Sequence, residues 1–260
     1  MAKTVSFLIS VIFYLIGVAG LFYFIFWLGD FLPINQMESS PRYSWSLSLL
    51  INTGLIAIFG IQHSVMARKN FKKSWTRIVP KQLERSIYVL ISGILCVTIA
   101  TFWCPIEGTI WEFEAGTIGF YLTYSLFFTG IVVLLTSTFL INHFELFGLQ
   151  QSYLHMMERA ARPPRFTTFA LYQIVRHPIY LGLIMIIWST PVMSFTHLSL
   201  SVLFTMYIFV GIYFEEQDLI KEYGHTYHNY KKSVPSVIPF TKIGSRTYIP
   251  KDKTAAAEIM

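Results

Sequence analysis

The sequence predicts an all-α, polytopic membrane protein with about six transmembrane segments, the last two of which form a helical hairpin. The chain of 260 residues is 54% hydrophobic and only 13% charged, and its mean hydropathy is +0.53. Soluble domains usually contain about 25% charged residues. At this length we expect one domain over residues 1–260, with no separate soluble module.

Four stretches in the first part of the chain are long and apolar enough to cross a bilayer, which takes about 20 helical residues. The first stretch is too long for the core of a signal peptide and has no convincing cleavage site after it, so we expect a retained anchor. The predicted spans are residues 5–29, 47–62, 86–106 and 115–142.

Residues 177–214 form a longer stretch without Asp, Glu, Lys or Arg. A single helix of this length overshoots the bilayer, whereas two short helices with a tight turn fit it. Pro191 and its polar neighbours in STPVMSFTHLS favour a break in the middle. We therefore predict a hairpin of helices 177–194 and 197–214.

Basic and non-basic loops alternate along the chain. Residues 63–85 carry many Lys and Arg, residues 142–176 hold four arginines, and the C-terminal tail is rich in lysine. The remaining loops are mostly acidic. Because cytosolic loops collect Lys and Arg, this alternation predicts six crossings, a multi-pass inner-membrane protein and both termini in the cytosol.

The net charge of +6 is explained by these loops, and no basic stripe on a soluble fold indicates a nucleic-acid partner. Cys96 and Cys104 lie in or beside one apolar stretch, which favours buried small side chains over a disulfide framework or a metal site. As a predicted integral membrane protein, the chain is expected to have the lipid bilayer as a partner. The oligomeric state is left open.

Three polar segments gather on the cytosolic face in this orientation: residues 62–90, 172–180 and 215–240. Arg176 and His177 precede Pro178, a residue well suited to the first turn of a helix. Glu215 and Glu216 close the second arm of the hairpin, which returns them to the level of Arg176 and His177. Contacts with lipid headgroups, or a salt bridge between the hairpin feet, would explain these residues without a function.

The functional interpretation is a site that needs both signs of charge, aromatic surface and an apolar entrance. S-adenosylmethionine fits this description, because its amino group requires a carboxylate and its carboxylate requires Arg, His or backbone N–H groups. The sequence contains no glycine-rich Rossmann turn. Composition by itself does not name the ligand.

Two stretches, RHPIYLG and EEQDLIKEYGHTYHNYKKSVPSVIP, resemble the isoprenylcysteine carboxyl methyltransferase superfamily. Its signature is Arg-His-Pro-x-Tyr, a helical hairpin, a Glu-Glu pair, a Gly-x-x-Tyr-x-x-Tyr segment and Val-Pro. The segment QHSVMARKNFKKSWTRIVPKQLERSIYVL is similar to the bacterial methanethiol S-methyltransferase family within that superfamily. With this segment the resemblance covers most of the chain.

The resemblance implies S-adenosylmethionine as methyl donor, enclosed by residues 150–240 on the cytosolic side. The matching positions imply cofactor contacts from Tyr172, His177, Pro178, Ile179, Tyr180 and Glu215, with backbone contacts between Arg165 and Thr167. One position departs from the pattern: Gly211 stands where the prenylcysteine enzymes have an Arg that meets the substrate carboxylate. The departure favours a small acceptor without a carboxylate.

Methyl transfer to sulfur requires an aligned thiolate, which is a better nucleophile than a thiol. Arg176 is a candidate for added positive potential, and His177 or Glu216 for the proton acceptor. His63, at the end of the second span, is another candidate base, although a helix-end hydrogen bond would also explain it. The basic residues 68–85 either meet anionic headgroups or cap the site through Trp75, Arg77, Glu84 and Arg85.

The leading interpretation is therefore S-adenosylmethionine-dependent methylation of a small apolar thiol, with methanethiol giving dimethyl sulfide. Three alternatives stay open from the sequence. They are a carboxyl O-methyltransferase acting on an isoprenylated cysteine or another lipophilic acceptor, a small transporter or channel, and a non-catalytic assembly factor.

Overall fold

A computed structural model describes residues 2–33, 37, 39–161 and 166–241. Five of its helices are long and apolar enough to cross a membrane. They are α1 (Ala2–Leu28), α2 (Trp45–Ala67), α4 (Lys81–Phe102), α5 (Ile118–Ile141) and α10 (Phe195–Tyr223), and the short apolar helix α9 (Pro178–Trp188) precedes α10. The predicted class, an all-α integral membrane protein with about six segments, is confirmed.

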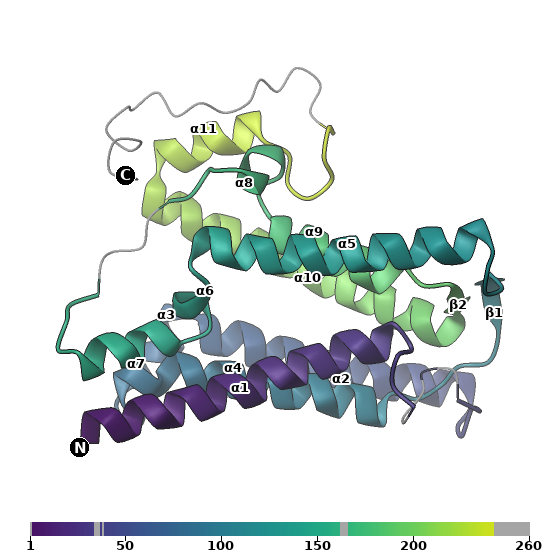
Figure 1. Cartoon of the computed structure of the whole chain (residues 1–260), viewed down its shortest axis with the longest axis horizontal. Coiled ribbons are helices and arrows are strands. Elements are labelled where there is room, and N and C mark those ends of the chain that lie inside the picture. Colours follow the sequence, from purple (N-terminus) through teal and green to yellow (C-terminus); the bar gives the residue numbers. More distant parts are fainter. Residues whose placement is uncertain (1, 34–36, 38, 162–165, 242–260) are drawn as a thin grey trace.

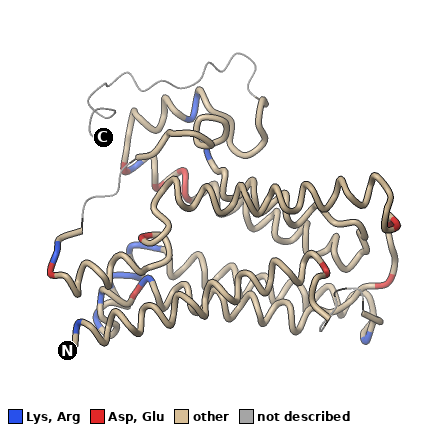
Figure 2. Tube along the Cα trace, in the orientation of Figure 1, with Lys and Arg blue, Asp and Glu red and all other residues tan. Residues whose placement is uncertain are grey.

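Short helices lie at one end of this bundle (Figure 1). They are α3 (Lys69–Trp75), α6 (His143–Leu146), α7 (Leu149–Met156), α8 (Leu171–Ile174) and α11 (His225–Ser233). The N-terminal end of α1 lies at the same end. Figure 2 shows that Lys and Arg gather there, whereas the middle of the long helices carries no charge. This end is called the basic end below.

The last two apolar helices form the predicted hairpin, although their bounds differ from the prediction. Helix α9 stops at Trp188, so its 11 residues extend about 16 Å, roughly half of a bilayer core. Helix α10 continues past residue 214 to Tyr223, which carries Glu215 and Glu216 on a rigid helix. The Trp188 indole donates to the Thr205 hydroxyl at 2.9 Å and holds the two arms together.

The turn of the hairpin contains a short strand that the sequence did not predict. Strand β2 (Val192–Ser194) pairs antiparallel with β1 (Thr109–Glu112), which lies in the connection between α4 and α5. Thr109 faces Ser194 and Trp111 faces Met193 in this register. The pairing lies at the end of the bundle opposite the basic end (Figure 1) and satisfies backbone groups where the helices stop.

Glycines let two pairs of helices approach closely. A Cβ placed on Gly17 of α1 would come within 2.6 Å of the Val89 carbonyl oxygen of α4, and Gly20 and Gly93 face each other in the same interface. In the second pair, a Cβ on Gly182 of α9 would lie 2.7 Å from the Leu134 amide nitrogen of α5. Small residues are the usual means of close helix packing in membranes, where no hydrophobic force acts between helices.

Replacing Gly93 with Ala should destabilise the protein by about 1–3 kcal/mol, because the added methyl group would force α1 away from α4. Thermal unfolding of the detergent-solubilised variant measures this loss as a lower transition midpoint. Gly54→Ala in α2 is the matched control, since a Cβ there meets nothing within 4 Å. Equal midpoints for the two variants would contradict the tight α1–α4 contact.

Candidate active site

A buried ion pair joins the two feet of the hairpin. The Arg176 guanidinium donates to Oε1 of Glu216 through Nε at 2.8 Å and through Nη2 at 2.5 Å. Arg176 is 8% exposed and Glu216 is 5% exposed. Charges at this depth are stable only when paired and hydrogen-bonded, so this contact fixes the start of α9 against the end of α10.

Two further side chains complete the surroundings of the Glu216 carboxylate. His177 Nε2 lies 3.2 Å from Oε1, and the Lys231 ammonium of α11 lies 2.6 Å from Oε2. Both carboxylate oxygens therefore have partners. Glu216 connects α9, α10 and α11 at one point.

The backbone before α9 is held by the segment that follows α11. The Arg176 amide donates to the Pro235 carbonyl at 2.9 Å, and the His177 amide donates to the Ser236 carbonyl at 3.0 Å. Arg176 Nη1 also donates to the carbonyls of Lys231, at 3.1 Å, and Val234. Helix α11 ends at Ser233 and the backbone of Val234 is extended, so the carbonyls of this Val-Pro-Ser segment are not used within a helix.

Tyr172, in α8, connects the start of the segment before α9 to α5 and α11. Its hydroxyl donates to the Ser137 carbonyl of α5 at 3.4 Å, and its own carbonyl accepts from the Tyr230 hydroxyl at 2.5 Å. Burial raises the pKa of the Tyr172 phenol, and the nearby Glu215 carboxylate raises it further. Tyr172 thus stays neutral and sits beside a carboxylate.

Glu215 differs from its neighbour Glu216 in being open to solvent. Its side chain is 45% exposed, and its Oε2 lies 3.8 Å from His177 Nδ1. It also interacts with the Tyr180 hydroxyl. Glu215 is not paired with an Arg or Lys side chain in the described part of the chain, so its carboxylate is available to a cationic ligand.

One face of α10 continues from Glu215 toward the membrane. Tyr207, Gly211 and Glu215 are spaced by four residues and share this face. A Cβ on Gly211 would meet only the Tyr180 hydroxyl, at 3.7 Å, so space remains beside Tyr180. Tyr180 also interacts electrostatically with Tyr207 and with Tyr88 of α4. Tyr207, Gly211 and Glu215 therefore share one face of α10, and the Tyr180 hydroxyl lies near Gly211 on it.

His63 approaches this region from α2. Its Nε2 lies 2.7 Å from the Tyr88 hydroxyl, and its Nδ1 lies 3.2 Å from the Ser92 hydroxyl, both on α4. The Tyr207 hydroxyl lies 3.4 Å from the hydroxyl of Ser64, the next residue of α2. The His63 ring also lies 6.5 Å from the Tyr207 ring, so His63 packs beside the face of α10 that carries Gly211 and Glu215.

The basic segment after α2 packs against the end of α10. Arg68 pairs with Asp218 at 3.0 Å and lies over the Phe214 ring, 4.6 Å from its centroid, while Lys69 pairs with Glu222 at 3.2 Å. Burial and the Arg85 charge lower the pKa of Lys72, although Glu84, 3.8 Å away, opposes this shift. At least three of the cations expected near headgroups thus contact acidic residues of the protein.

The structure brings most of the sequence-predicted residues together at the basic end. They are Tyr172, Arg176, His177, Pro178, Ile179, Tyr180, Glu215 and Glu216. Thr167 is half-buried beside Phe166, which packs on Tyr227 and Tyr230. Arg165 lies outside the described residues. No group of three or more His, Cys, Asp or Glu in the described ranges is placed to hold a metal ion.

Sequence reasoning missed Tyr88, Tyr207, Tyr230 and Lys231. The four-residue spacing of Tyr207, Gly211 and Glu215 was a detectable signal, because it places them on one face of a helix. Tyr230 and Lys231 lie in the quoted YGHTYHNYKK stretch. Nothing in the sequence pairs Tyr88 with His63, since this contact depends on how α2 and α4 are rotated.

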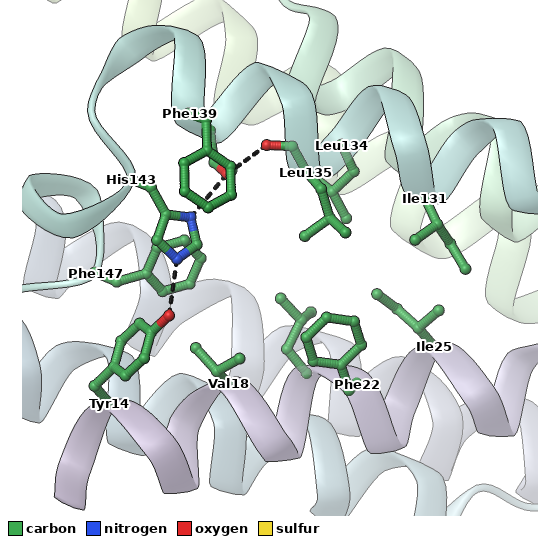
Figure 3. Close-up of a pocket in the computed structure, with 12 residues that line it drawn as sticks. Tyr14, Val18, Phe22, Ile25, Ile131, Leu134, Leu135, Phe139, His143 and Phe147 are labelled. Atoms are coloured by element: carbon green, nitrogen blue, oxygen red, sulfur yellow. Dashed lines mark hydrogen bonds between the residues drawn. The ribbon is translucent and has the colours of Figure 1, made fainter. Parts of the chain in front are cut away.

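A separate cavity of about 220 Å3 lies between α1 and α5 (Figure 3). Apolar side chains such as Val18, Phe22 and Leu135 line it, and His143 closes one end. None of the sequence-predicted site residues belongs to its lining. The cavity is therefore distinct from the cluster around Glu215 and Glu216.

Comparison with known proteins places the chain in a family. It is 48% identical over 210 residues to a methanethiol S-methyltransferase from Crocosphaera subtropica, which covers 81% of this chain and 82% of that protein. It is 41% identical to methanethiol S-methyltransferase 1 from Bradyrhizobium diazoefficiens, over 92% of this chain and 84% of that protein. The chain belongs to the methanethiol S-methyltransferase family.

More distant similarity extends beyond this family. Residues 122–234 match a family described as a protein of unknown function, DUF1295. The chain is also 30% identical to Nurim from Xenopus laevis, over 68% of this chain and 64% of that protein. No solved structure matches the chain.

Replacing Glu216 with Ala should lower the stability by about 3–5 kcal/mol, because it leaves the Arg176 guanidinium buried without its carboxylate. Thermal unfolding in detergent measures the change. Glu222→Ala on the same helix is the control, because it removes only the exposed pair with Lys69 and should cost about 0–1 kcal/mol. Similar losses of stability in both variants would show that the Glu216 cluster contributes no more to the fold than an exposed ion pair.

Proposed function

We propose that this protein methylates methanethiol to dimethyl sulfide with S-adenosylmethionine as methyl donor, at the cytosolic side of the membrane. The observation that carries the proposal is the Glu215 carboxylate, which is open to solvent, lies 3.8 Å from His177 and acts electrostatically on Tyr172 and Tyr180. Relatives named methanethiol S-methyltransferase, covering most of the chain, support the same reaction.

The residues present suit a zwitterionic ligand that also has an aromatic part. Glu215 would receive the amino group of S-adenosylmethionine, His177 would lie near its charged end, and Tyr172 and Tyr180 would offer aromatic surface. When bound, S-adenosylmethionine supplies an electrophilic methyl carbon on a sulfonium. The task of Arg176 in this proposal is to position His177 through the shared Glu216 carboxylate.

Gly211 supports a small acceptor. It leaves the space beside the Tyr180 hydroxyl open at a position where the prenylcysteine enzymes, which this chain resembles, have an Arg for the substrate carboxylate. Tyr207 lies one turn before Gly211 on the same face of α10 and offers aromatic surface that suits an apolar thiol. Methanethiol partitions into lipid, so a site at the membrane boundary meets it at high local concentration.

The orientation follows from charge. Lys and Arg concentrate at the basic end, where α1 begins and α11 lies (Figure 2). By the positive-inside rule this end faces the cytosol, which contains S-adenosylmethionine. In this proposal both termini are cytosolic, and the bacterial relatives are consistent with an inner-membrane location.

Purified protein supplied with S-adenosylmethionine and methanethiol should produce dimethyl sulfide, measured by gas chromatography. A prenylated cysteine offered in parallel should not be methylated, because Gly211 provides no cation for its carboxylate. Methylation confined to the prenylated cysteine would replace the proposal by the carboxyl O-methyltransferase alternative.

Replacing Glu215 with Ala should weaken S-adenosylhomocysteine binding by about 10- to 100-fold, because a charge-assisted hydrogen bond contributes about 1.5–3 kcal/mol. Calorimetric titration of the solubilised protein measures the affinity. Glu222→Ala removes a carboxylate two turns further along α10 and should bind like the unmodified protein. Unchanged affinity in Glu215→Ala would remove Glu215 from the cofactor site.

A further inference from the structure

A chain of hydrogen bonds between α2 and α4 determines which nitrogen of His63 carries the proton. The Ser92 hydroxyl donates its hydrogen to the Tyr88 carbonyl at 2.9 Å. Its oxygen therefore accepts from His63, 3.2 Å away, so the ring hydrogen of neutral His63 is on Nδ1. His63 Nε2 is then unprotonated and accepts the Tyr88 hydroxyl hydrogen across 2.7 Å.

This arrangement leaves the Tyr88 oxygen able to accept a hydrogen bond. A phenol oxygen has one hydrogen and two lone pairs, and here the hydrogen is directed at His63. A donor that approached Tyr88 from the other side could pass a proton to its oxygen while Tyr88 passes its own proton to His63. Tyr88 and His63 thus have the geometry of a two-step proton relay.

The relay lies against the face of α10 that carries Tyr207. The His63 ring lies 6.5 Å from the Tyr207 ring, and Gly211 and Glu215 follow Tyr207 at four-residue spacing on the same face. Tyr180 and Glu215 also interact electrostatically with Tyr88. The Arg85 guanidinium lies over the Tyr88 ring at 4.9 Å, and Glu84 also acts on Tyr88. Lys72 of α3 approaches Glu84 at 3.8 Å. These are the charged and titratable groups around the relay in the described part of the chain.

We propose that the Tyr88–His63 pair removes the proton of the thiol substrate, an inference that rests on the proposed function. The S–H hydrogen passes to the Tyr88 oxygen as the Tyr88 hydroxyl hydrogen passes to His63 Nε2, which becomes an imidazolium. The freed sulfur electron pair forms the new bond to the methyl carbon, whose bond to the sulfonium breaks with its electrons left on the donor sulfur. His63 later returns the proton to water.

The other candidate bases are occupied by structural contacts. Both oxygens of Glu216 have partners, in Arg176, His177 and Lys231. His177 Nε2 faces Glu216 and its Nδ1 faces Glu215, so both ring nitrogens point at carboxylates. In contrast, the relay ends on a nitrogen that gains a proton without breaking an ion pair.

The chain contains a matched comparison for this relay. His143 Nε2 lies 2.9 Å from the Tyr14 hydroxyl, and its Nδ1 lies 2.9 Å from the Thr138 hydroxyl, which donates to the Leu135 carbonyl (Figure 3). The hydrogen-bonding pattern is that of Tyr88, His63 and Ser92. This second chain lies at the α1–α5 cavity, away from Glu215, so Tyr14→Phe removes an equivalent bond without touching the proposed site.

The test compares Tyr88→Phe, His63→Gln and Tyr14→Phe with the unmodified protein. His63→Gln keeps an acceptor for Tyr88 but cannot take up a proton. Both relay variants should lose about 100-fold or more of kcat/KM for methanethiol at neutral pH, which is typical for the loss of a general base. Their kcat/KM should rise about tenfold per pH unit below the thiol pKa, because only thiolate formed in solution then reacts. Tyr14→Phe should keep the unmodified rate and pH profile.

A second readout does not depend on turnover. The infrared S–H stretch of methanethiol bound to the S-adenosylhomocysteine complex should be shifted by its hydrogen bond to Tyr88, and the shift should disappear in Tyr88→Phe. Calorimetry should give unchanged S-adenosylhomocysteine affinity in every variant, which shows that the cofactor site is folded.

The outcomes separate this inference from the proposed function. An active unmodified protein whose Tyr88→Phe variant keeps the rate, the pH profile and the S–H shift would overturn the relay and leave the function intact. Weakened S-adenosylhomocysteine binding in both relay variants would also overturn it, because the residues would then support the cofactor site. Absence of dimethyl sulfide from the unmodified protein would overturn the proposed function itself.

Discussion

The buried Glu216 carboxylate is the constraint on which the basic end of the protein depends. A carboxylate with 5% exposure requires full compensation, and it comes from two segments: Arg176 and His177 before α9, and Lys231 of α11. Because Glu216 itself belongs to α10, meeting this requirement places the start of α9, the end of α10 and helix α11 at one point. The adjacent Glu215 is then presented on the same rigid helix but on its open side, where it is available to a ligand.

The rest of the bundle supports the Glu216 cluster from the membrane side. Helices α1 and α4 pack through facing glycines, and α5 and α9 pack closely through Gly130 and Gly182. The short β1–β2 pairing ties the connections at the far end. The proposed acceptor region lies where the α2–α4 side meets α9 and α10, so it takes residues from both halves of the chain.

The arrangement separates the two kinds of chemistry that the proposed reaction combines. Charged groups that would suit a zwitterionic methyl donor lie at the basic end. Tyrosines and the open space at Gly211 lie next to them on the membrane side of α10, where an apolar thiol would arrive.

The amino-acid sequence by itself determined the membrane class, four of the spans to within a few residues, the hairpin and the approach of Arg176 and His177 to the Glu-Glu pair. These features follow from local properties: a crossing needs about 20 apolar residues, and a tight turn returns its two ends to the same level. Only the tertiary structure decided the β1–β2 pairing, the extension of α10 to Tyr223 and the contact between His63 and Tyr88. Each of these depends on how helices that are distant in the chain are rotated and shifted against one another. Hydropathy does not encode these relative positions.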